Sequence, residues 1–279
     1  MRKLIAVMCC ERLYARVEAI QETWAQDMPK DGTLDLRFFF GRGYRHGCTF
    51  QRPDEITLDV EESYAALPDK VQAMLQWSVQ QGYDYTFKTD DDVYVSPAVL
   101  ARCTTAPHDY IGRFRGPSGG YPADYASGYG YWLSQKAARI VAESPRNKDW
   151  AEDRWVGNLL AVKRVQAWRD DASYAAVAPY LMPQAICEGN VSKQAAAFCE
   201  FSDPKVMREM HKFYKQLVNP RFFLPGVLRA VNQYTTTDAD YFREPTDTPD
   251  WNKQERSVAA VVAPALKVCP TCHGSGTVK

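Results

Sequence analysis

The run Lys88-Thr89-Asp90-Asp91-Asp92-Val93-Tyr94-Val95 sets three consecutive aspartates behind the apolar and aromatic stretch Tyr83–Phe87. This pattern predicts a strand over Tyr83–Val95 that carries acid near its end. Three adjacent carboxylates repel one another and need a counter-charge. In an extended segment Asp90 and Asp92 point to one face, where they suit a divalent cation that keeps positions open for phosphate oxygens and water. The alternative for such a run is a solvated acidic turn.

The segments around this run alternate between strand and helix patterns. Apolar spacing predicts further strands and helices, which are Leu4–Cys9, Tyr14–Ala25, Leu36–Phe40, Leu67–Gln81, Ser96–Cys103 and Ser134–Glu143. Pro68 suits a first helical turn, and Gly82 suits a helix end. The alternation indicates βαβ units and an α/β fold with a mostly parallel central sheet. Because ligands bind at the carboxyl ends of such strands, the acidic run lies where a binding site is expected.

Composition and charge exclude several classes of protein. The chain has 279 residues, enough for one large domain or a domain and a half, and 46% of them are hydrophobic. It carries 34 basic and 34 acidic residues, so its overall charge gives no sign of nucleic acid or anionic membrane as a partner. No apolar run approaches the roughly 20 residues that span a bilayer. Met1–Cys10 lacks a signal-peptide cleavage site, so Leu4–Cys9 within it is interpreted as a buried first strand.

Two further stretches carry candidate site residues. Glycines and aromatic residues are mixed over Gly116–Ser134, which favours tight turns with flat side chains along a cleft, or a braced hairpin without a ligand. Glu152 and Asp153 fall at the expected start of a helix that continues over Val156–Val162. Acids in a first turn stabilise the helix dipole, so this pair has a structural as well as a chemical interpretation.

Taken together, five blocks resemble the beta-1,3-galactosyltransferase and Fringe family of glycosyltransferases. Arg16–Trp24 is similar to the family's "R-x-x-I-R-x-T-W" motif, and Asp59–Lys70 is similar to "D-F-x-D-S-Y-x-N-L-T-x-K". Lys88–Val95 is similar to "K-x-D-D-D-V-F-V". Further along the chain, Tyr121–Tyr131 is similar to "Y-P-x-Y-x-S-G-x-G-Y", and Glu152–Gly157 is similar to "E-D-V-x-x-G". A single D-x-D motif would be weak evidence, but five blocks in the family's order over roughly residues 4–170 are far more specific.

The resemblance implies a GT-A fold, which is a Rossmann-like nucleotide-sugar-binding fold. It also implies a divalent metal, Mn²⁺ or Mg²⁺, a UDP-sugar donor and transfer with inversion. By family position Asp92 is the direct metal ligand, while Asp90 and Asp91 lie near the ribose and the metal waters, and Asp90 shares in holding the metal. Asp153 matches the catalytic base, with Glu152 as its neighbour or second choice.

The resemblance also assigns residues around the substrates. Those placed near the nucleotide are Arg16, Lys70 and Lys88. Those whose backbone approaches the donor sugar are Gly128 and Gly130. Those with flat faces on which a sugar of the acceptor or a base can stack are Tyr121, Tyr125 and Trp132.

The chain departs from the family pattern in several places. Gln21 replaces the second arginine of the first block. The family's C-terminal histidine ligand has no clear equivalent, so the third metal ligand is either Cys199 or its neighbour Glu200, or His211, for which a surface role is the alternative. The chain begins at the first strand, and its eight cysteines are irregularly spaced. We therefore expect reduced thiols and a bacterial or phage-type relative that works in cytoplasm.

The C-terminal third lies outside the resemblance. We expect a GT-A domain over 1–212, an extension and connector over 213–266, and a cysteine tail over 267–279. The tail resembles one C-x-x-C-x-G-x-G unit of the zinc domain of J-domain chaperones. Cys269, Cys272 and His273 supply at most part of a four-ligand zinc site, so the alternatives are structural Zn²⁺ and a frayed end.

Three functions follow from these interpretations. The first is an active transferase whose acceptor is a glycan, a lipid-linked sugar, a protein or a hydroxymethylated base in DNA. The second is a catalytically inactive GT-A-like module that binds a nucleotide sugar or glycan. The third is a scaffold that acts through the cysteine tail. The sequence specifies neither the sugar, the acceptor nor the oligomeric state.

Overall fold

The computed structural model describes residues 1–43, 52–103, 105–145, 151–170, 174–176, 196–199, 201 and 203–218. The chain divides into two compact units, Met1–Thr235 and Thr236–Lys279, and the described residues all belong to the first. The predicted zinc ligands Cys269, Cys272 and His273 lie outside the described residues, so zinc binding stays a prediction.

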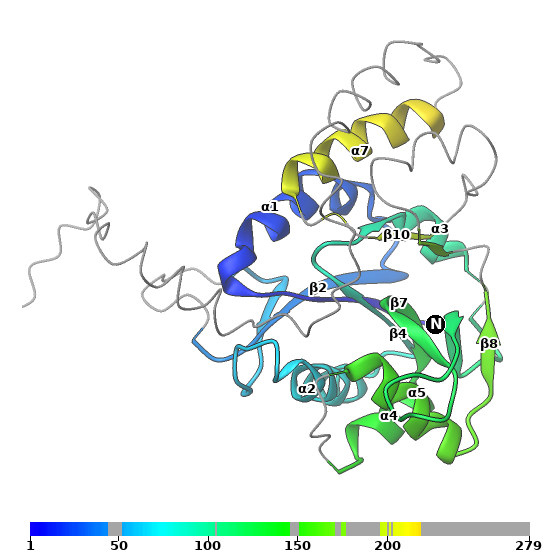
Figure 1. Ribbon diagram of the computed structural model, residues 1–279. Coiled ribbons are helices and arrows are strands. Elements are labelled where there is room, and N and C mark those ends of the chain that lie inside the picture. Colours follow the sequence, from blue (N-terminus) through cyan, green and yellow to red (C-terminus); the bar gives the residue numbers. More distant parts are fainter. Residues whose placement is uncertain are drawn as a thin grey trace, which may run out of the picture. The chain divides into compact units, whose positions relative to one another are not determined.

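Strands and helices alternate along most of the chain, as expected (Figure 1). In order, they are β1 (Lys3–Met8), η1 (Glu11–Leu13), α1 (Tyr14–Glu22), η2 (Trp24–Asp27), β2 (Leu34–Phe40), β3 (Glu55–Thr57), α2 (Leu67–Gln80), β4 (Tyr85–Asp90), β5 (Tyr94–Val95), α3 (Pro97–Arg102), β6 (Tyr110–Arg115), β7 (Tyr125–Ser134), α4 (Gln135–Ala142), α5 (Glu152–Val162), β8 (Ala167–Arg169), β9 (Tyr174–Ala176), β10 (Ala197–Cys199) and α7 (Pro204–Val218).

The main sheet has seven strands in the order β3-β2-β1-β4-β7-β6-β8. β1, β2, β3 and β4 run parallel to one another, β7 runs antiparallel to both β4 and β6, and β8 is parallel to β6. The predicted α/β class with a mostly parallel central sheet is confirmed, and the arrangement is consistent with a GT-A-like fold. A second sheet, β5-β10-β9, begins directly after the acidic run.

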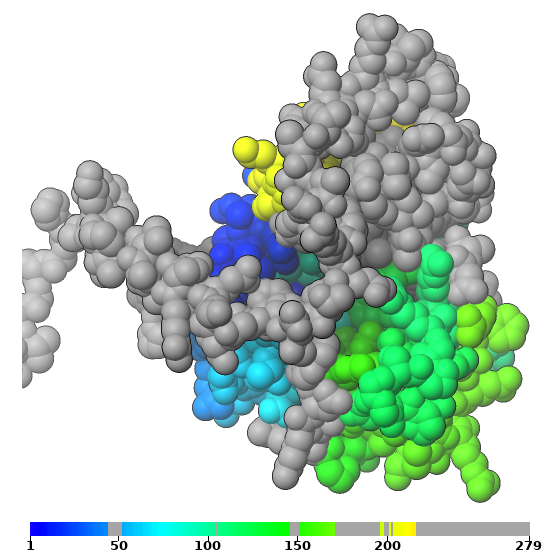
Figure 2. Space-filling model, in the orientation of Figure 1, coloured from blue at the N-terminus to red at the C-terminus, as the bar shows by residue number. Residues whose placement is uncertain are grey.

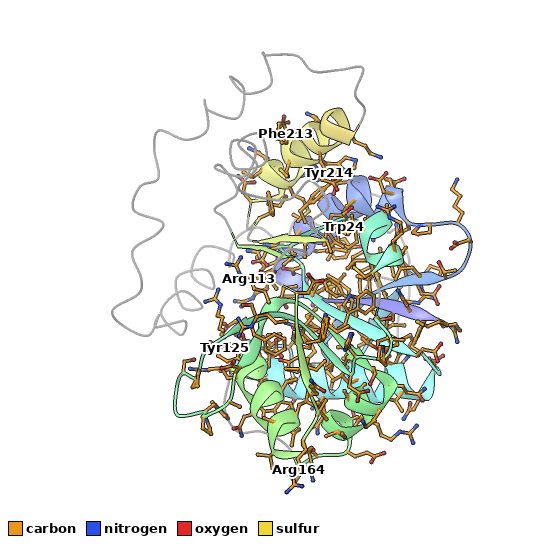
Figure 3. All side chains as sticks on the ribbon, turned by 90° about the vertical axis from the view of Figure 1, so that its right-hand side faces the viewer. Trp24, Arg113, Tyr125, Arg164, Phe213 and Tyr214 are labelled. Carbon is orange, nitrogen blue, oxygen red and sulfur yellow. The ribbon has the colours of Figure 1, made fainter. Side chains whose placement is uncertain are left out.

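Apolar side chains cover both faces of the main sheet. One core cluster joins the sheet to α1, α3 and α7 and includes Trp24, Phe213 and Tyr214, which lie together in Figure 3. The other joins the sheet to α2, α4 and α5. In the space-filling view, the cyan residues of α2 and the green residues of β6 to α5 form much of the lower surface (Figure 2). Burial on both faces explains why β1 is apolar along almost its whole length.

The central strand is shorter than predicted. β4 ends at Asp90, Asp91 and Asp92 form a turn, and β5 belongs to the second sheet. The Val93 amide donates to the Asp90 carbonyl at 3.3 Å, which closes this turn. The prediction of one continuous strand over Tyr83–Val95 is therefore wrong, because the chain leaves the main sheet at the first aspartate.

Two other boundaries bear on the sequence predictions. The helix expected over Tyr14–Ala25 ends at Glu22, and η2 follows after Thr23. Helix α7 runs through residue 212, where the sequence places the end of the GT-A domain, and that division stays a prediction. In the described part of the chain, no helix has both the length and the apolar character needed to cross a membrane.

Candidate active site

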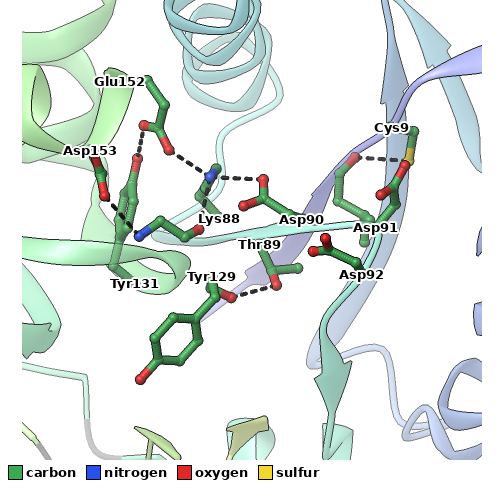
Figure 4. Close-up of polar contacts among 12 residues, drawn as sticks. Cys9, Lys88, Thr89, Asp90, Asp91, Asp92, Tyr129, Tyr131, Glu152 and Asp153 are labelled. Atoms are coloured by element: carbon green, nitrogen blue, oxygen red, sulfur yellow. Dashed lines mark hydrogen bonds and ion pairs between the residues drawn. The ribbon is translucent and has the colours of Figure 1, made fainter. Parts of the chain in front are cut away.

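The carboxyl end of β4 brings together acidic residues from distant parts of the sequence (Figure 4). Asp90 ends β4, Asp91 and Asp92 occupy the following turn, and Glu152 and Asp153 begin α5. The antiparallel pairing of β7 with β4 sets Tyr131 beside Lys88. The backbone of β7 therefore passes between the acidic turn and the start of α5.

Lys88 is at the centre of one ion cluster, which we call the lysine cluster and which comprises Lys88, Asp90 and Glu152. The Lys88 Nζ lies 2.9 Å from Asp90 Oδ1 and 2.6 Å from Glu152 Oε1. It also donates a hydrogen bond to the Gly128 carbonyl at 2.8 Å. The Tyr131 hydroxyl donates to Glu152 Oε2 at 3.0 Å, so both oxygens of Glu152 are engaged.

Charge and burial set the protonation states in this cluster. Burial alone would lower the pKa of the Lys88 ammonium, but Asp90 and Glu152 outweigh it and hold that pKa above its usual value. Burial also raises the pKa of Glu152, against the opposing effect of Lys88. The ammonium is thus charged at neutral pH and stabilises the acids around it.

Asp153 is held differently from Glu152. Its Oδ2 accepts a hydrogen bond from the Gly128 amide at 3.2 Å, and its Oδ1 accepts one from the amide of Arg154 at 2.8 Å. Gly157, one turn further along α5, leaves room for the helix to pack on β7, because a Cβ there would lie 2.4 Å from the Tyr125 Cβ. The short contact fixes the start of α5, and with it Asp153, against β7.

Arg16 forms a second ion cluster with Asp91 and Asp92, which we call the arginine cluster. The Arg16 Nη1 lies 3.0 Å from Asp91 Oδ1 and 3.6 Å from Asp92 Oδ2. The Cys10 amide donates to Asp91 Oδ2 at 3.3 Å. Burial raises the pKa of Asp91 to about 6, although Arg16 acts in the opposite direction. Asp91 points inward, whereas the Asp92 side chain is 25% exposed.

Three of the residues predicted to lie near the nucleotide sugar have buried side chains that bind other parts of the protein. Lys70 binds the Cys9 carbonyl at 2.8 Å and pairs with Glu62. Lys88 and Asp91 are also buried, and they form the ion pairs and hydrogen bonds of the lysine and arginine clusters. The predicted places of these three residues near the nucleotide stay predictions. Arg16 and Asp90 retain partial exposure, so their assignment stays a prediction.

The predicted sugar-facing residues divide in the same way. Trp132 is 1% exposed and packs against Phe87 in the core, and Tyr125 is also buried, so neither offers an exposed ring. Tyr121 is partly exposed and stays a candidate. A Cβ on Gly130 would lie 2.7 Å from the Phe87 ring, so this glycine is needed for packing, and its approach to a sugar stays a prediction. Gly128 borders the lysine cluster and stays a candidate.

The described residues contain two exposed carboxylates suited to a metal but no complete protein-made site. Asp90 and Asp92 are 32% and 25% exposed. In the described part of the chain, no three residues of the His, Cys, Asp and Glu types form a group that could hold a metal ion. The prediction of His211 as third ligand is therefore not supported, and its Nδ1 is hydrogen bonded to the Tyr94 hydroxyl at 2.9 Å. The side chain of Cys199 lies outside the described residues.

Sequence reasoning missed two tyrosines of the site. Tyr131 holds Glu152, and its position opposite Lys88 depends on strand register that no local pattern reveals. Tyr64 is 50% exposed. Burial raises the pKa of Tyr64, with Asp90 and Asp153 as further causes, so its ring lies within the field of the acidic site. It belongs to the Asp59–Lys70 block, but no property of its own distinguished it there.

Comparisons with known proteins bear on the same region. A model of the galactosyltransferase family matches residues 15–110, which include Arg16 and the acidic run but not α5. No curated protein matches the chain. Among solved structures, the chain is similar to a glycosyltransferase involved in the glycosylation of the major capsid of PBCV-1, at 15% sequence identity and a TM-score of 0.45, over 76% of this chain and 99% of that one. The family match supports glycosyl transfer as the activity of this chain.

Proposed function

We propose that the chain is a metal-dependent glycosyltransferase that moves a sugar from a UDP-sugar to an acceptor hydroxyl with inversion. The family match supports glycosyl transfer. The UDP-sugar donor, the metal and the inverting course come from the resemblance of the motif blocks. A hexose such as galactose is the first sugar to test.

One observation carries this proposal. Asp90 and Asp153 belong to β4 and α5, yet both are linked through the same residue of β7, Gly128. The Gly128 carbonyl binds Lys88, which pairs with Asp90, and the Gly128 amide binds Asp153 (Figure 4). A displacement with inversion needs a group that stabilises the leaving diphosphate and, on the other side of the sugar, a base. The link through Gly128 supports the proposal of one acid for each task.

The contacts favour Asp153 over Glu152 as the base. Glu152 is buried, and both of its oxygens already bind Lys88 and Tyr131. Asp153 is partly exposed and is positioned by two backbone amides. We propose that an oxygen of Asp153 takes the proton of the acceptor hydroxyl as that oxygen attacks the anomeric carbon.

The donor side fits a metal that is shared with the substrate. The two ion clusters and Asp153 together have a formal charge of −3. They contain two cations, Lys88 and Arg16, and five acids, which are Asp90, Asp91, Asp92, Glu152 and Asp153. Asp92, together with Asp90, would hold Mn²⁺ or Mg²⁺, which usually keeps positions for phosphate oxygens and water. When bound, the ion would stabilise the negative charge of the UDP leaving group. Arg16 would hold Asp92 in place.

The proposal for the acceptor covers several kinds of molecule. A glycan, a glycolipid, a protein and a hydroxymethylated base in DNA each supply a hydroxyl. The formal charge of zero gives no long-range attraction toward a polyanion such as DNA. The half-exposed ring of Tyr64 and the partly exposed ring of Tyr121 are the side chains we propose to meet the acceptor or the donor sugar.

The test is release of UDP from UDP-galactose and other UDP-sugars in the presence of Mn²⁺ and a panel of acceptors. We expect turnover by the wild type and a loss of about 10²–10⁴-fold in kcat for Asp153→Asn, with UDP affinity unchanged. Asp109→Asn is the matched control, since Asp109 precedes β6 at the opposite end of the sheet. Full activity of Asp153→Asn would contradict the base assignment.

The same experiment tests the second candidate, an inactive binding module. The pairing of Asp90 with Lys88 and the incomplete metal site among the described residues favour this alternative. An inactive module would bind UDP or a UDP-sugar without turnover under any acceptor. Its affinity would not depend on Asp153.

A further inference from the structure

Lys88 is a buried cation whose hydrogens are all used inside the protein. Its side chain is 1% exposed. An ammonium has three N–H donors. Three acceptors lie within hydrogen-bonding distance, namely Asp90 Oδ1 at 2.9 Å, Glu152 Oε1 at 2.6 Å and the Gly128 carbonyl at 2.8 Å. No donor of Lys88 is left for a phosphate or a sugar.

The three acceptors belong to three different elements. Asp90 ends β4, Gly128 lies in β7, and Glu152 begins α5. The register of β7 against β6 shifts between Gly112 and Phe114, so the regular pairing is interrupted beside Gly128. Such an irregularity frees a peptide group for other contacts. Here the Gly128 carbonyl accepts from Lys88, and its amide donates to Asp153.

We infer that Lys88 is a positioning residue, which fixes the β7 peptide that holds Asp153 and the carboxylate of Asp90 relative to each other. This inference rests on the proposed function for its effect on turnover. It replaces the contact with the nucleotide that the motif resemblance assigns to Lys88. Lys88 acts on both halves of the site without touching either substrate.

The geometry around Gly128 explains why a change at Lys88 would reach Asp153. A Cβ placed on Gly128 would lie 3.3 Å from Glu152 Oε1, 3.5 Å from Lys88 Nζ and 3.6 Å from Asp153 Oδ2. The peptide is thus enclosed by the three side chains. Without Lys88, Gly128 loses the bond to its carbonyl, and buried Glu152 loses the cation that stabilises its charge. A shift of about 1 Å in a reacting group can lower a rate by about 10²-fold.

The test separates positioning from simple charge balance. Lys88→Met leaves Glu152 without its cation, so this variant alone could fail to fold. The double variant Lys88→Met/Glu152→Gln removes both buried charges and keeps the core apolar or neutral. Lys136→Met is the matched control, since Lys136 is 70% exposed and pairs with Asp109 away from the site.

Three quantities are measured on each folded variant. They are kcat for UDP release, the dissociation constant of UDP with Mn²⁺, and the exchange rate of the Gly128 amide by nuclear magnetic resonance. For the double variant we expect kcat to fall by about 10²-fold. We expect the Gly128 amide to exchange about tenfold faster. Because Asp90 also loses its partner, UDP binding should weaken, but by less than about tenfold. The control should match the wild type in all three.

Two results would overturn the inference. A UDP affinity weakened more than about tenfold, with kcat retained at saturation, would make Lys88 a nucleotide ligand. If the double variant keeps the wild-type kcat and the wild-type exchange rate of the Gly128 amide, Lys88 serves only to neutralise the charge of Glu152. The exchange rate also distinguishes this inference from the proposed function. If the wild type neither binds UDP nor turns over, the proposed function fails, while faster Gly128 exchange still supports the positioning of Gly128 by Lys88.

Discussion

The lysine cluster and the arginine cluster lie on either side of the same strand end, yet they are built in opposite ways. In the lysine cluster a buried cation is surrounded by acids and a carbonyl. In the arginine cluster a buried acid, Asp91, is held by a cation and an amide, while Asp92 remains partly exposed. The first is suited to hold elements together. Each cluster also carries one partly exposed carboxylate, Asp90 in the first and Asp92 in the second, and these two are suited to hold a metal together.

The largest effect on stability is expected from Lys88→Met. The substitution leaves buried Glu152 without its counter-ion, and removal of one partner from a buried pair costs about 3–5 kcal/mol. Urea denaturation should show this loss in the free energy of unfolding. Lys88→Met/Glu152→Gln should recover part of it, since no buried charge then remains unpaired. A single variant as stable as the wild type would show that the lysine cluster does not hold the fold.

Gly157→Ala is the next largest change, and it tests how α5 reaches the lysine cluster. Alanine favours a helix by about 1 kcal/mol over glycine. Here, however, the added Cβ would lie 2.4 Å from the Tyr125 Cβ and 2.8 Å from its Cα. We expect a net loss of about 2 kcal/mol, because overpacking moves the backbone. Thermal unfolding measures it, and a gain in stability would contradict this packing. Gly82 lies at a helix end, but its φ is positive, and an alanine there would be strained. Gly82→Ala is therefore not a suitable control.

Arg16→Met should cost less than Lys88→Met. Asp91 would lose its cation, but the Arg16 side chain is 17% exposed, so solvent already weakens the pair. We expect a loss of about 1–2 kcal/mol in unfolding free energy. The sharper effect should be on ligand binding, since Asp92 also loses a neighbour. An unchanged affinity for UDP with Mn²⁺ in Arg16→Met would separate the arginine cluster from the donor site.

The smallest expected effect is a pH dependence that comes from Glu152. Burial raises the pKa of Glu152 in the folded protein above 4.5, the ordinary value for a glutamate side chain. The folded state therefore binds more protons than the unfolded state above that pH, and the contribution of Glu152 to stability falls as the pH rises. The difference in unfolding free energy between wild type and Glu152→Gln should therefore shift against the wild type as the pH rises from about 4 toward neutral. A shift in the opposite direction would contradict this sign.

Much of the fold could be predicted because its signals are local. Apolar runs, Pro68 and Gly82 place the strands and helices to within a few residues. The break of the central strand at Asp91 could not be predicted, because it depends on Arg16, which lies 75 residues away in the sequence. Only the fold decides whether three aspartates continue a strand or turn out of it.

The site was harder to predict than the fold. The motif blocks identified Asp90, Asp92 and Asp153, and the roles given to these acids stay predictions. They could not show which neighbours are buried. β7 is buried along almost its whole length, so alternation does not reveal that Trp132 packs in the core. The burial of Lys88 likewise depends on Glu152, which comes from another helix.

The most direct test of the central claim is a calorimetric titration of UDP with and without Mn²⁺, on the wild type and on Asp92→Asn. Our account predicts that the wild type binds UDP more tightly when Mn²⁺ is present, and that Asp92→Asn abolishes this metal dependence. Asp109→Asn should behave as the wild type. Absence of UDP binding in the wild type under both conditions, or binding that neither Mn²⁺ nor Asp92→Asn changes, would contradict the donor site at the end of β4.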